Sequence, residues 1–249
     1  MRKKLGPGKC VHCLKDVEER NSDHVFPASW YPDSTPPNLE KWQIPSCIPC
    51  NSDYGKLESD LLSRVGLCLD PHATASKSIV ESALRSMKYQ AGRNDRDRAL
   101  GAARGRKILG ETLHGADIPE TAVIPGMGNR WNLPTEEQVA VLLPAESLRR
   151  MTEKIVRGIF YIEEQKFIEP PYVIDFFVLP EDATAPWSQA LDKFGTVYAR
   201  EPGIVVRRTV AHEDNISSLF EITFWQHFKT YASLSRLEES EQPAVILDA

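Results

Sequence analysis

The stretch that decides the fold of this 249-residue chain reads Cys10-Val-His-Cys13, then Asp23-His-Val-Phe-Pro27, and then Cys47-Ile-Pro-Cys50-Asn51. Two Cys-x-x-Cys pairs can present four thiolates to one metal ion, and zinc is the usual occupant of such a site. The 33 residues between the two pairs exceed the loop of a simple zinc ribbon and leave room for a functional segment. We therefore predict a loop-rich unit organised by structural zinc, with a chance arrangement of cysteines as the alternative; the predicted ligands are Cys10, Cys13, Cys47 and Cys50.

The start of the chain and its hydropathy bear on the expected compartment. No apolar segment follows the first charged residues, and no run approaches the roughly eighteen apolar residues of a membrane span. We therefore expect a cytoplasmic protein without a membrane partner, in which the thiols stay reduced and available to a metal. Cys68 stands alone and is expected to be a small buried hydrophobe, and His12 is expected to be a bystander inside the first cysteine pair.

Three residues close to the cysteine frame carry candidate chemistry. A neutral imidazole such as that of His24 can take a proton from water at physiological pH. The Asp23 carboxylate and the Asn51 carbonyl oxygen are ligands that hard divalent cations prefer. Because zinc held by four thiolates has no open position, a catalytic ion, Mg²⁺ or Mn²⁺, has to be a separate one. The pattern predicts metal-assisted cleavage of phosphodiester bonds.

These motifs resemble those of the zinc-containing HNH endonucleases, over about residues 8–65. The resemblance implies a ββα-metal fold, in which a hairpin carries the acid–histidine pair and the cysteine pairs join it to a helix. It implies that His24 is the general base, that Asp23 is a metal ligand, and that Asn51 is a second ligand in place of the family's final histidine. The family's middle asparagine corresponds to Asn38, or else Asn38 is only a loop residue, because it lies farther from the second cysteine pair than the family pattern places it.

Charge divides the chain into three predicted parts. Residues 1–66 form the predicted HNH domain, and the first sixty residues hold 8 Lys and Arg against 9 Asp and Glu. Residues 67–115 form a predicted helical connector, and the segment 61–115 is basic, with 10 against 5. Residues 116–249 form a predicted α+β domain and are acidic, with 12 against 21. The basic segment suits phosphate contact, although a solvated helix surface explains it equally well.

Hydrophobic periodicity gives an α+β fold for the whole chain. A helix is expected directly after the second cysteine pair, with cap-type residues at Asn51, Ser52 and Asp53. The other expected helices cover 73–89, 94–113 and 145–167, and the expected strands cover 172–180, 196–199, 203–210 and 219–225. Residues 225–228 are expected to lead from a strand into a helix.

Two functions follow from these observations. The first is a metal-dependent endonuclease acting on nucleic acid, more readily DNA than RNA, in a mobile-element or antiviral defence context that rests on family analogy alone. The second is a zinc-dependent module that binds nucleic acid or protein without catalysis, which gives no reason for Asp23, His24 and Asn51 to occur together. The acidic C-terminal domain suits contact with a protein partner or with a second copy of the chain.

Overall fold

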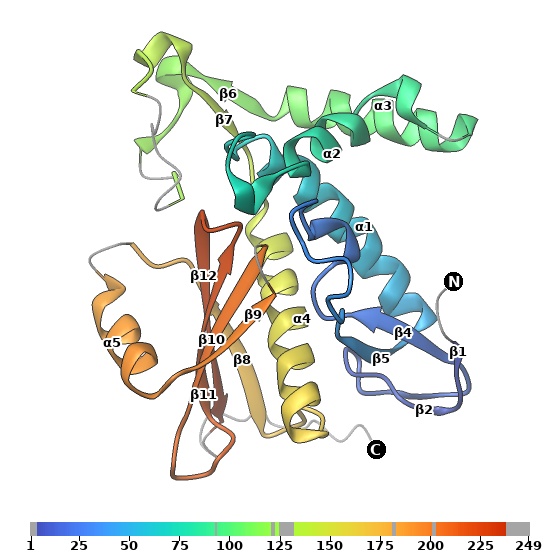
Figure 1. Ribbon diagram of the computed structural model, residues 1–249, viewed down its shortest axis with the longest axis vertical. Coiled ribbons are helices and arrows are strands. Elements are labelled where there is room, and N and C mark those ends of the chain that lie inside the picture. Colours follow the sequence, from blue (N-terminus) through green and yellow to red (C-terminus); the bar gives the residue numbers. More distant parts are fainter. Residues whose placement is uncertain are drawn as a thin grey trace, which may run out of the picture.

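A computed structural model describes residues 4–92, 94–120, 123–124, 132–180, 183–200 and 203–237. It is a mixed α+β structure with three visible parts (Figure 1). The first is a small unit of short strands and one helix, here called the cysteine unit (residues 4–66). The second is an arm made by α2, α3, β6 and β7, and the third is a sheet with one helix on each face. In the described residues no helix is both long and apolar enough to cross a membrane.

The cysteine unit consists of very short strands followed by one long helix. β1 (Lys4–Leu5), β4 (Arg20–His24) and β5 (Gln43–Cys47) form a sheet in the order β1-β4-β5. β2 (Gly8–Lys9) pairs with β3 (Asp16–Val17) and frames the first cysteine pair. β4 and β5 are antiparallel, with Asp23 opposite Ile44 and His24 opposite Gln43. Strands this short need another source of order.

Helix α1 (Ile48–Gly66) begins directly after β5. Its N-cap is Cys47, whose sulfur accepts a hydrogen bond from the backbone N–H of Cys50. The expectation that the helix begins after the cysteine pair, capped by Asn51, is therefore wrong by one turn. The reason is that a thiol takes the capping position that a hydroxyl or carboxylate usually fills.

The arm extends from the end of α1, as Figure 1 shows. α2 (Ile79–Ser86) packs against α1, and α3 (Asp95–Gly110) is capped by the Asn94 side chain, which accepts from the N–H of Asp97, as predicted. β6 (Thr112–His114) and β7 (Val139–Val141) form a two-stranded ribbon that carries the chain back. Arg64 of α1 is fully buried and bonds Asp60, Glu111 and the carbonyl oxygen of Leu142, so α1 holds both sides of the arm.

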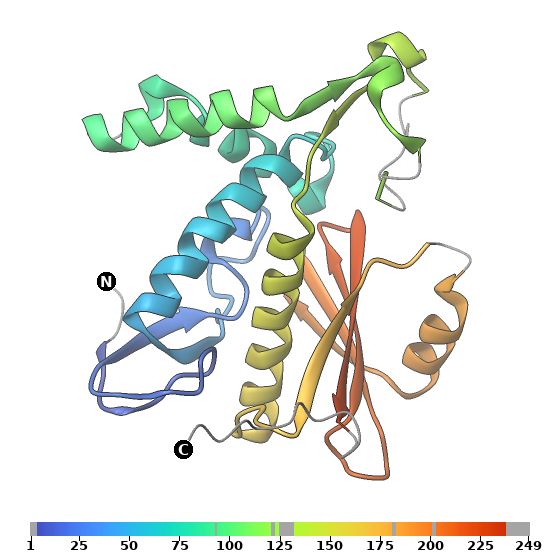
Figure 2. The same ribbon diagram turned by 180° about the vertical axis from the view of Figure 1, so that it is seen from behind.

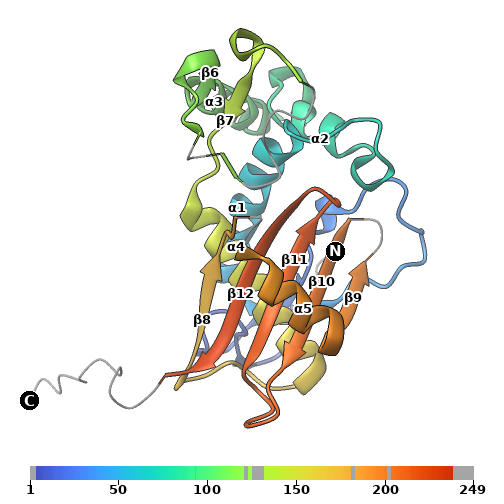
Figure 3. The ribbon, with the colours of Figure 1, turned by 90° about the vertical axis from the view of Figure 1, so that its left-hand side faces the viewer.

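The C-terminal part is a five-stranded antiparallel sheet in the order β8-β12-β11-β10-β9. α4 (Ala145–Glu164) contacts one face through β8 and β12, and α5 (Ala185–Phe194) contacts β10 and β11; Figure 3 shows the two helices on opposite faces. The strands are β8 (Tyr172–Phe177), β9 (Thr196–Arg200), β10 (Ile204–Val210), β11 (Ser218–Phe224) and β12 (Phe228–Arg236).

The predicted strand-to-helix transition at residues 225–228 is wrong. Trp225 and Gln226 both have positive φ, 48° and 56°, and they turn β11 directly into β12, with Phe224 opposite Phe228. Two consecutive left-handed residues give a tight hairpin whose twist matches that of the flanking strands. Because the turn lacks the usual Asn-Gly signal, the sequence pattern did not indicate it. β12 and α5 were both missed.

The cysteine unit and the C-terminal sheet share one hydrophobic core, with α4 between them; α1 and α4 lie side by side (Figure 2). Trp225 Nε1 donates to the carbonyl oxygen of Trp30 over 2.9 Å, and the two indole rings lie 5.0 Å apart. Gly158 of α4 faces Val25, whose side chain would lie 2.8 Å from an added Cβ. A glycine is therefore needed where α4 approaches the cysteine unit.

Because of this close approach, two glycine-to-alanine substitutions are expected to change the free energy of unfolding in opposite directions. Gly158→Ala is expected to lower the free energy of unfolding by about 1–3 kcal/mol, because the methyl group overpacks against buried Val25. Gly55→Ala, in α1 with nothing within 4 Å of the added methyl, is the matched control and is expected to raise it by up to about 1 kcal/mol. Urea denaturation measures both; equal stabilisation by the two alanines would contradict the packing described.

Candidate functional site

The four paired cysteines converge on one point. Their sulfur atoms all lie within 4.8 Å of one another, and the Sγ atoms of Cys13 and Cys47 are 3.9 Å apart. A tetrahedral zinc with Zn–S bonds of about 2.3 Å needs sulfurs about 3.8 Å apart, so the group fits a structural zinc. The first pair lies in the turn between β2 and β3, Cys47 ends β5, and Cys50 lies in the first turn of α1. The ion would thus join three segments.

Backbone N–H groups favour the thiolate form of Cys10, whereas burial raises the pKa of Cys47 and of Cys50. The N–H of Cys47 donates to the sulfur of Cys10 over 3.3 Å. Burial alone would raise the pKa of Cys10, but hydrogen bonds from the backbone of Cys13, Cys47 and His12 lower it to about 7. The sulfur is therefore ready to ligate a metal near neutral pH. Four protein thiolates would leave zinc no open position, so a zinc bound here would be structural.

Asp23 points into the interior and already has two partners. It is 6% exposed, its Oδ2 lies 3.0 Å from Nε2 of His12, and its Oδ1 accepts from the ammonium of Lys154 over 3.2 Å. Burial would raise the pKa of Asp23, but the hydrogen bond from His12 and the charge of Lys154 outweigh it and hold the pKa below its usual value. Burial also lowers the pKa of His12, which favours a neutral ring that donates to Asp23. The expectation that His12 is a bystander is wrong.

Lys154 brings α4 into this site. Its side chain is fully buried and forms a second ion pair with Glu58 of α1. Its Nζ lies 5.4 Å from the ring centroid of Tyr54, and the ring of Tyr54 also packs against His12 with centroids 4.5 Å apart. We call these five residues the Asp23 cluster: His12, Asp23, Tyr54, Glu58 and Lys154. The cluster joins the cysteine unit to α4 through charges that are largely shielded from water.

His24 lies at the end of β4 and is partly exposed. Successive side chains of a strand point to opposite faces, so His24 faces away from the side on which Asp23 lies. The amide nitrogen of Gln43, opposite it on β5, lies 3.2 Å from Nε2 of His24. The imidazole is therefore adjacent to Asp23 along the chain but on the opposite face of β4, and the Gln43 amide contacts its ring.

Asn51 and Asn38 differ in what they contact. Asn51 is 3% exposed, and its amide nitrogen donates to Oδ1 of Asn21 over 2.8 Å and to the carbonyl oxygen of Ser22 over 3.1 Å. It fastens the first turn of α1 to β4. Asn38 is exposed in the turn closed by the hydrogen bond from the N–H of Leu39 to the carbonyl oxygen of Pro36. Asn38 thus lies in a loop, which fits both interpretations that the sequence left open.

As placed, these donors do not fit the divalent cation that the resemblance implies. Both oxygens of Asp23 are engaged by His12 and Lys154, and Asn51 turns its amide nitrogen, not its carbonyl, toward β4. Among the described residues, the four cysteines are the only group of three or more His, Cys, Asp or Glu side chains close enough together to hold a metal.

Glu58 and Lys154 were not recognised from the sequence. One signal was available: Lys154 lies three residues after Met151 and one before Ile155, on the apolar face of α4, where a charged residue needs a buried partner. The partner itself could not be named, because Asp23 is 131 residues away in the chain. A lysine on an apolar helix face thus predicts a buried ion pair but does not identify the residue that pairs with it.

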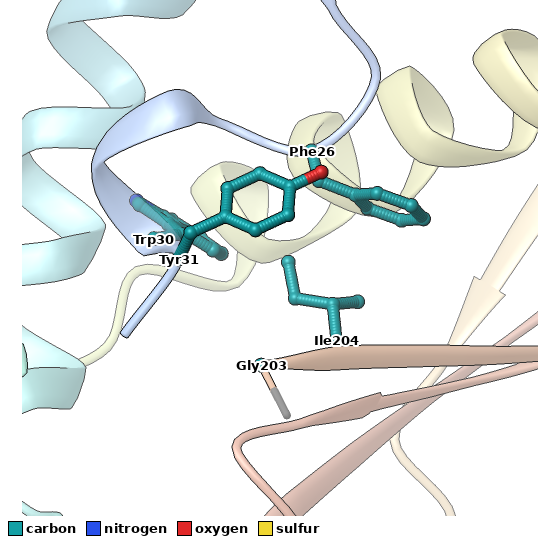
Figure 4. Close-up of a pocket in the computed structure, with 5 residues that line it drawn as sticks. All are labelled: Phe26, Trp30, Tyr31, Gly203 and Ile204. Atoms are coloured by element: carbon teal, nitrogen blue, oxygen red, sulfur yellow. The ribbon is translucent and has the colours of Figure 1, made fainter. Parts of the chain in front are cut away.

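A small hollow between the cysteine unit and the C-terminal sheet lies apart from this site. Phe26, Trp30, Tyr31, Gly203 and Ile204 line it, and Figure 4 shows the Tyr31 ring lying between Phe26 and Trp30, above Ile204. No carboxylate, imidazole or thiol lines it, so it is a packing hollow and carries no chemistry.

Comparison with protein-family models, with curated proteins and with solved structures finds no match for this chain.

Proposed function

We propose that this chain is an endonuclease of the HNH type, which hydrolyses phosphodiester bonds of nucleic acid with His24 as the base. DNA is a more favoured substrate in this proposal than RNA. The observation that carries the proposal is the arrangement of the cysteine unit. Two antiparallel strands lead directly into α1, four thiols close the unit, and the acid–histidine pair ends β4 while Asn51 lies in the first turn of α1. This is the order of elements that the resemblance implies.

His24 suits the task of activating water. An imidazole is neutral in part at physiological pH and can accept a proton from water that attacks phosphorus in line. The side chain of Gln43 holds the ring from the neighbouring strand. As placed, the Gln43 amide nitrogen donates to Nε2 and occupies its lone pair; with the amide turned over, its oxygen accepts Nε2–H and leaves Nδ1 as the proton acceptor, so the contact supports Nδ1 as the base.

The resemblance assigns Mg²⁺ or Mn²⁺ to Asp23 and Asn51, yet the ammonium of Lys154 already pairs with Asp23. Cleavage is therefore to be measured with and without added divalent ion.

The exposed side of α3 supports nucleic acid as the partner. At 100° per residue, Arg96, Arg106 and Lys107 lie on one side of this helix, and Ala99 and Ala103 lie between them. All five side chains are exposed. Small residues among cations let a phosphate backbone approach closely, and each neutralised phosphate releases counterions. We propose that this side of α3 contacts backbone phosphates.

A second candidate is a zinc module that binds nucleic acid or protein without catalysis. The observation that favours it is that His12 and Lys154 already occupy the Asp23 carboxylate.

We also propose that the acidic segment 116–249 contacts a protein partner or a second copy of the chain, since 21 acidic against 12 basic residues disfavour phosphate contact there. A role in mobile elements or antiviral defence belongs to the proposal by analogy alone.

Replacing His24 tests the catalytic proposal. His24→Ala is expected to lower the rate of plasmid cleavage by about 10²–10⁴-fold, the usual contribution of a general base, while zinc content and thermal stability stay at the wild-type level. The control is His212→Ala, an exposed histidine in the loop between β10 and β11. Cleavage by His24→Ala at the wild-type rate, with or without Mg²⁺ or Mn²⁺, would leave the non-catalytic module as the better account.

The salt dependence of DNA binding tests the proposed surface of α3. Replacing both Arg106 and Lys107 by Gln removes two cations, and it is expected to reduce the slope of log K against log salt by about 1.8 for duplex DNA. Lys166→Gln, an exposed lysine just after α4, removes one charge elsewhere and should leave the slope unchanged. A slope that the double variant does not alter would show that α3 makes no phosphate contact.

A further inference from the structure

Lys154 is a charged residue in an apolar setting. It is 0% exposed on α4, and Met151, Ile155, Val156 and Ile159 around it are at most 1% exposed. A buried ammonium is unfavourable unless opposite charges and hydrogen bonds compensate it. The compensation comes from outside α4: Asp23 of β4 lies 3.2 Å from its Nζ, and Glu58 of α1 forms the second ion pair.

Asp23 and Glu58 are stabilised by the cation between them, just as the buried ammonium of Lys154 is stabilised by the two carboxylates. Asp23 and Glu58 both contact one nitrogen atom, so their charges are close together, and two such carboxylates repel unless a cation lies between them. Their side chains are only 8% and 16% exposed, so water screens the repulsion little. Two inward carboxylate oxygens around one positive charge are also part of the ligand set that a divalent cation uses.

We propose that the ammonium of Lys154 is the resident cation of the Asp23 cluster, taking the place between Asp23 and Glu58 that a divalent ion would otherwise occupy. Lys154 is thereby a positioning residue: it fixes Asp23, and through Asp23 the end of β4 that carries His24. This inference deepens the proposed function and rests on it for the role of His24. It also makes the docking of α4 a condition for an ordered site.

The packing of α4 explains why an ion does not displace Lys154. To leave the cluster, the ammonium would have to reach water, but its helix face is buried among apolar side chains. Gly158, one turn further along, lies so close to Val25 that an added Cβ would be 2.8 Å from its side chain, so α4 packs tightly against the cysteine unit there. Mg²⁺ and Mn²⁺ give up their bound waters at a cost that a carboxylate already paired with an ammonium does not offset.

Manganese titration of the full-length, zinc-loaded protein tests the inference. Free Mn²⁺ is counted by its electron paramagnetic resonance signal for the wild type, Lys154→Met, and the control Lys166→Met. Wild type and control are expected to show no stoichiometric Mn²⁺ site. Lys154→Met, which keeps a long unbranched side chain without the charge, is expected to bind one Mn²⁺ per chain at least tenfold more tightly than the wild type, and adding Glu58→Gln should abolish that gain.

Either of two results would overturn the inference. One is a Mn²⁺ site in the wild type that Asp23→Asn removes, because Asp23 would then hold the ion with Lys154 present. The other is a folded Lys154→Met variant, with full zinc content, that gains no Mn²⁺ site. If Lys154→Met does not fold, the wild-type titration still decides, together with Lys154→Arg, which keeps the charge and is expected to exclude Mn²⁺. Because no arm measures cleavage, failure of the nuclease proposal at His24 remains a separate result.

Discussion

Four sulfur atoms, contributed by the turn after β2, the end of β5 and the first turn of α1, meet within 4.8 Å. The strands around them are too short to hold a sheet unaided, since β1, β2 and β3 have two residues each. A metal held by four thiolates compensates for the small core of such a unit and couples its folding to metal binding. The positions of β4 and α1, and thus of Asp23, His24 and Asn51, depend on this closure.

A second constraint joins the cysteine unit to the rest of the molecule. α4 contacts the C-terminal sheet and also reaches the Asp23 cluster through Lys154, while Trp225 donates to the backbone of Trp30. Buried polar contacts of this kind specify one arrangement, because a shifted α4 would leave an ammonium and two carboxylates unpaired. The candidate site therefore belongs to the whole chain, and the N-terminal quarter that carries the motifs does not complete it alone.

Local signals predicted much of this structure. Cysteine spacing gave the four-thiol cluster, apolar periodicity gave α4 close to its observed bounds, and the Asn94 cap marked the start of α3. Features decided by tertiary contacts were missed or displaced. The N-cap of α1 is a thiol that the cluster fixes in place, and the left-handed turn at Trp225 is held by packing against Trp30.

The same distinction applies within the site. Sequence placed Asp23, His24 and Asn51 near the cysteine frame, and the structure puts all three on β4 and the start of α1. It could not show that Asp23 and His24 diverge, because that depends on the pleat of β4, nor that Lys154 pairs with Asp23 across 131 residues. Charge pairing between distant segments leaves no periodic trace in a sequence.

X-ray absorption at the zinc edge of the purified full-length protein tests the central claim most directly. The account predicts one zinc per chain, surrounded by four sulfur atoms at about 2.3 Å with no nitrogen or oxygen in the first shell. A shell of three sulfurs and one nitrogen would mean that one of the four cysteines is not a ligand. That result, or a protein folded without zinc, would contradict the closure on which the arrangement of β4 and α1 depends.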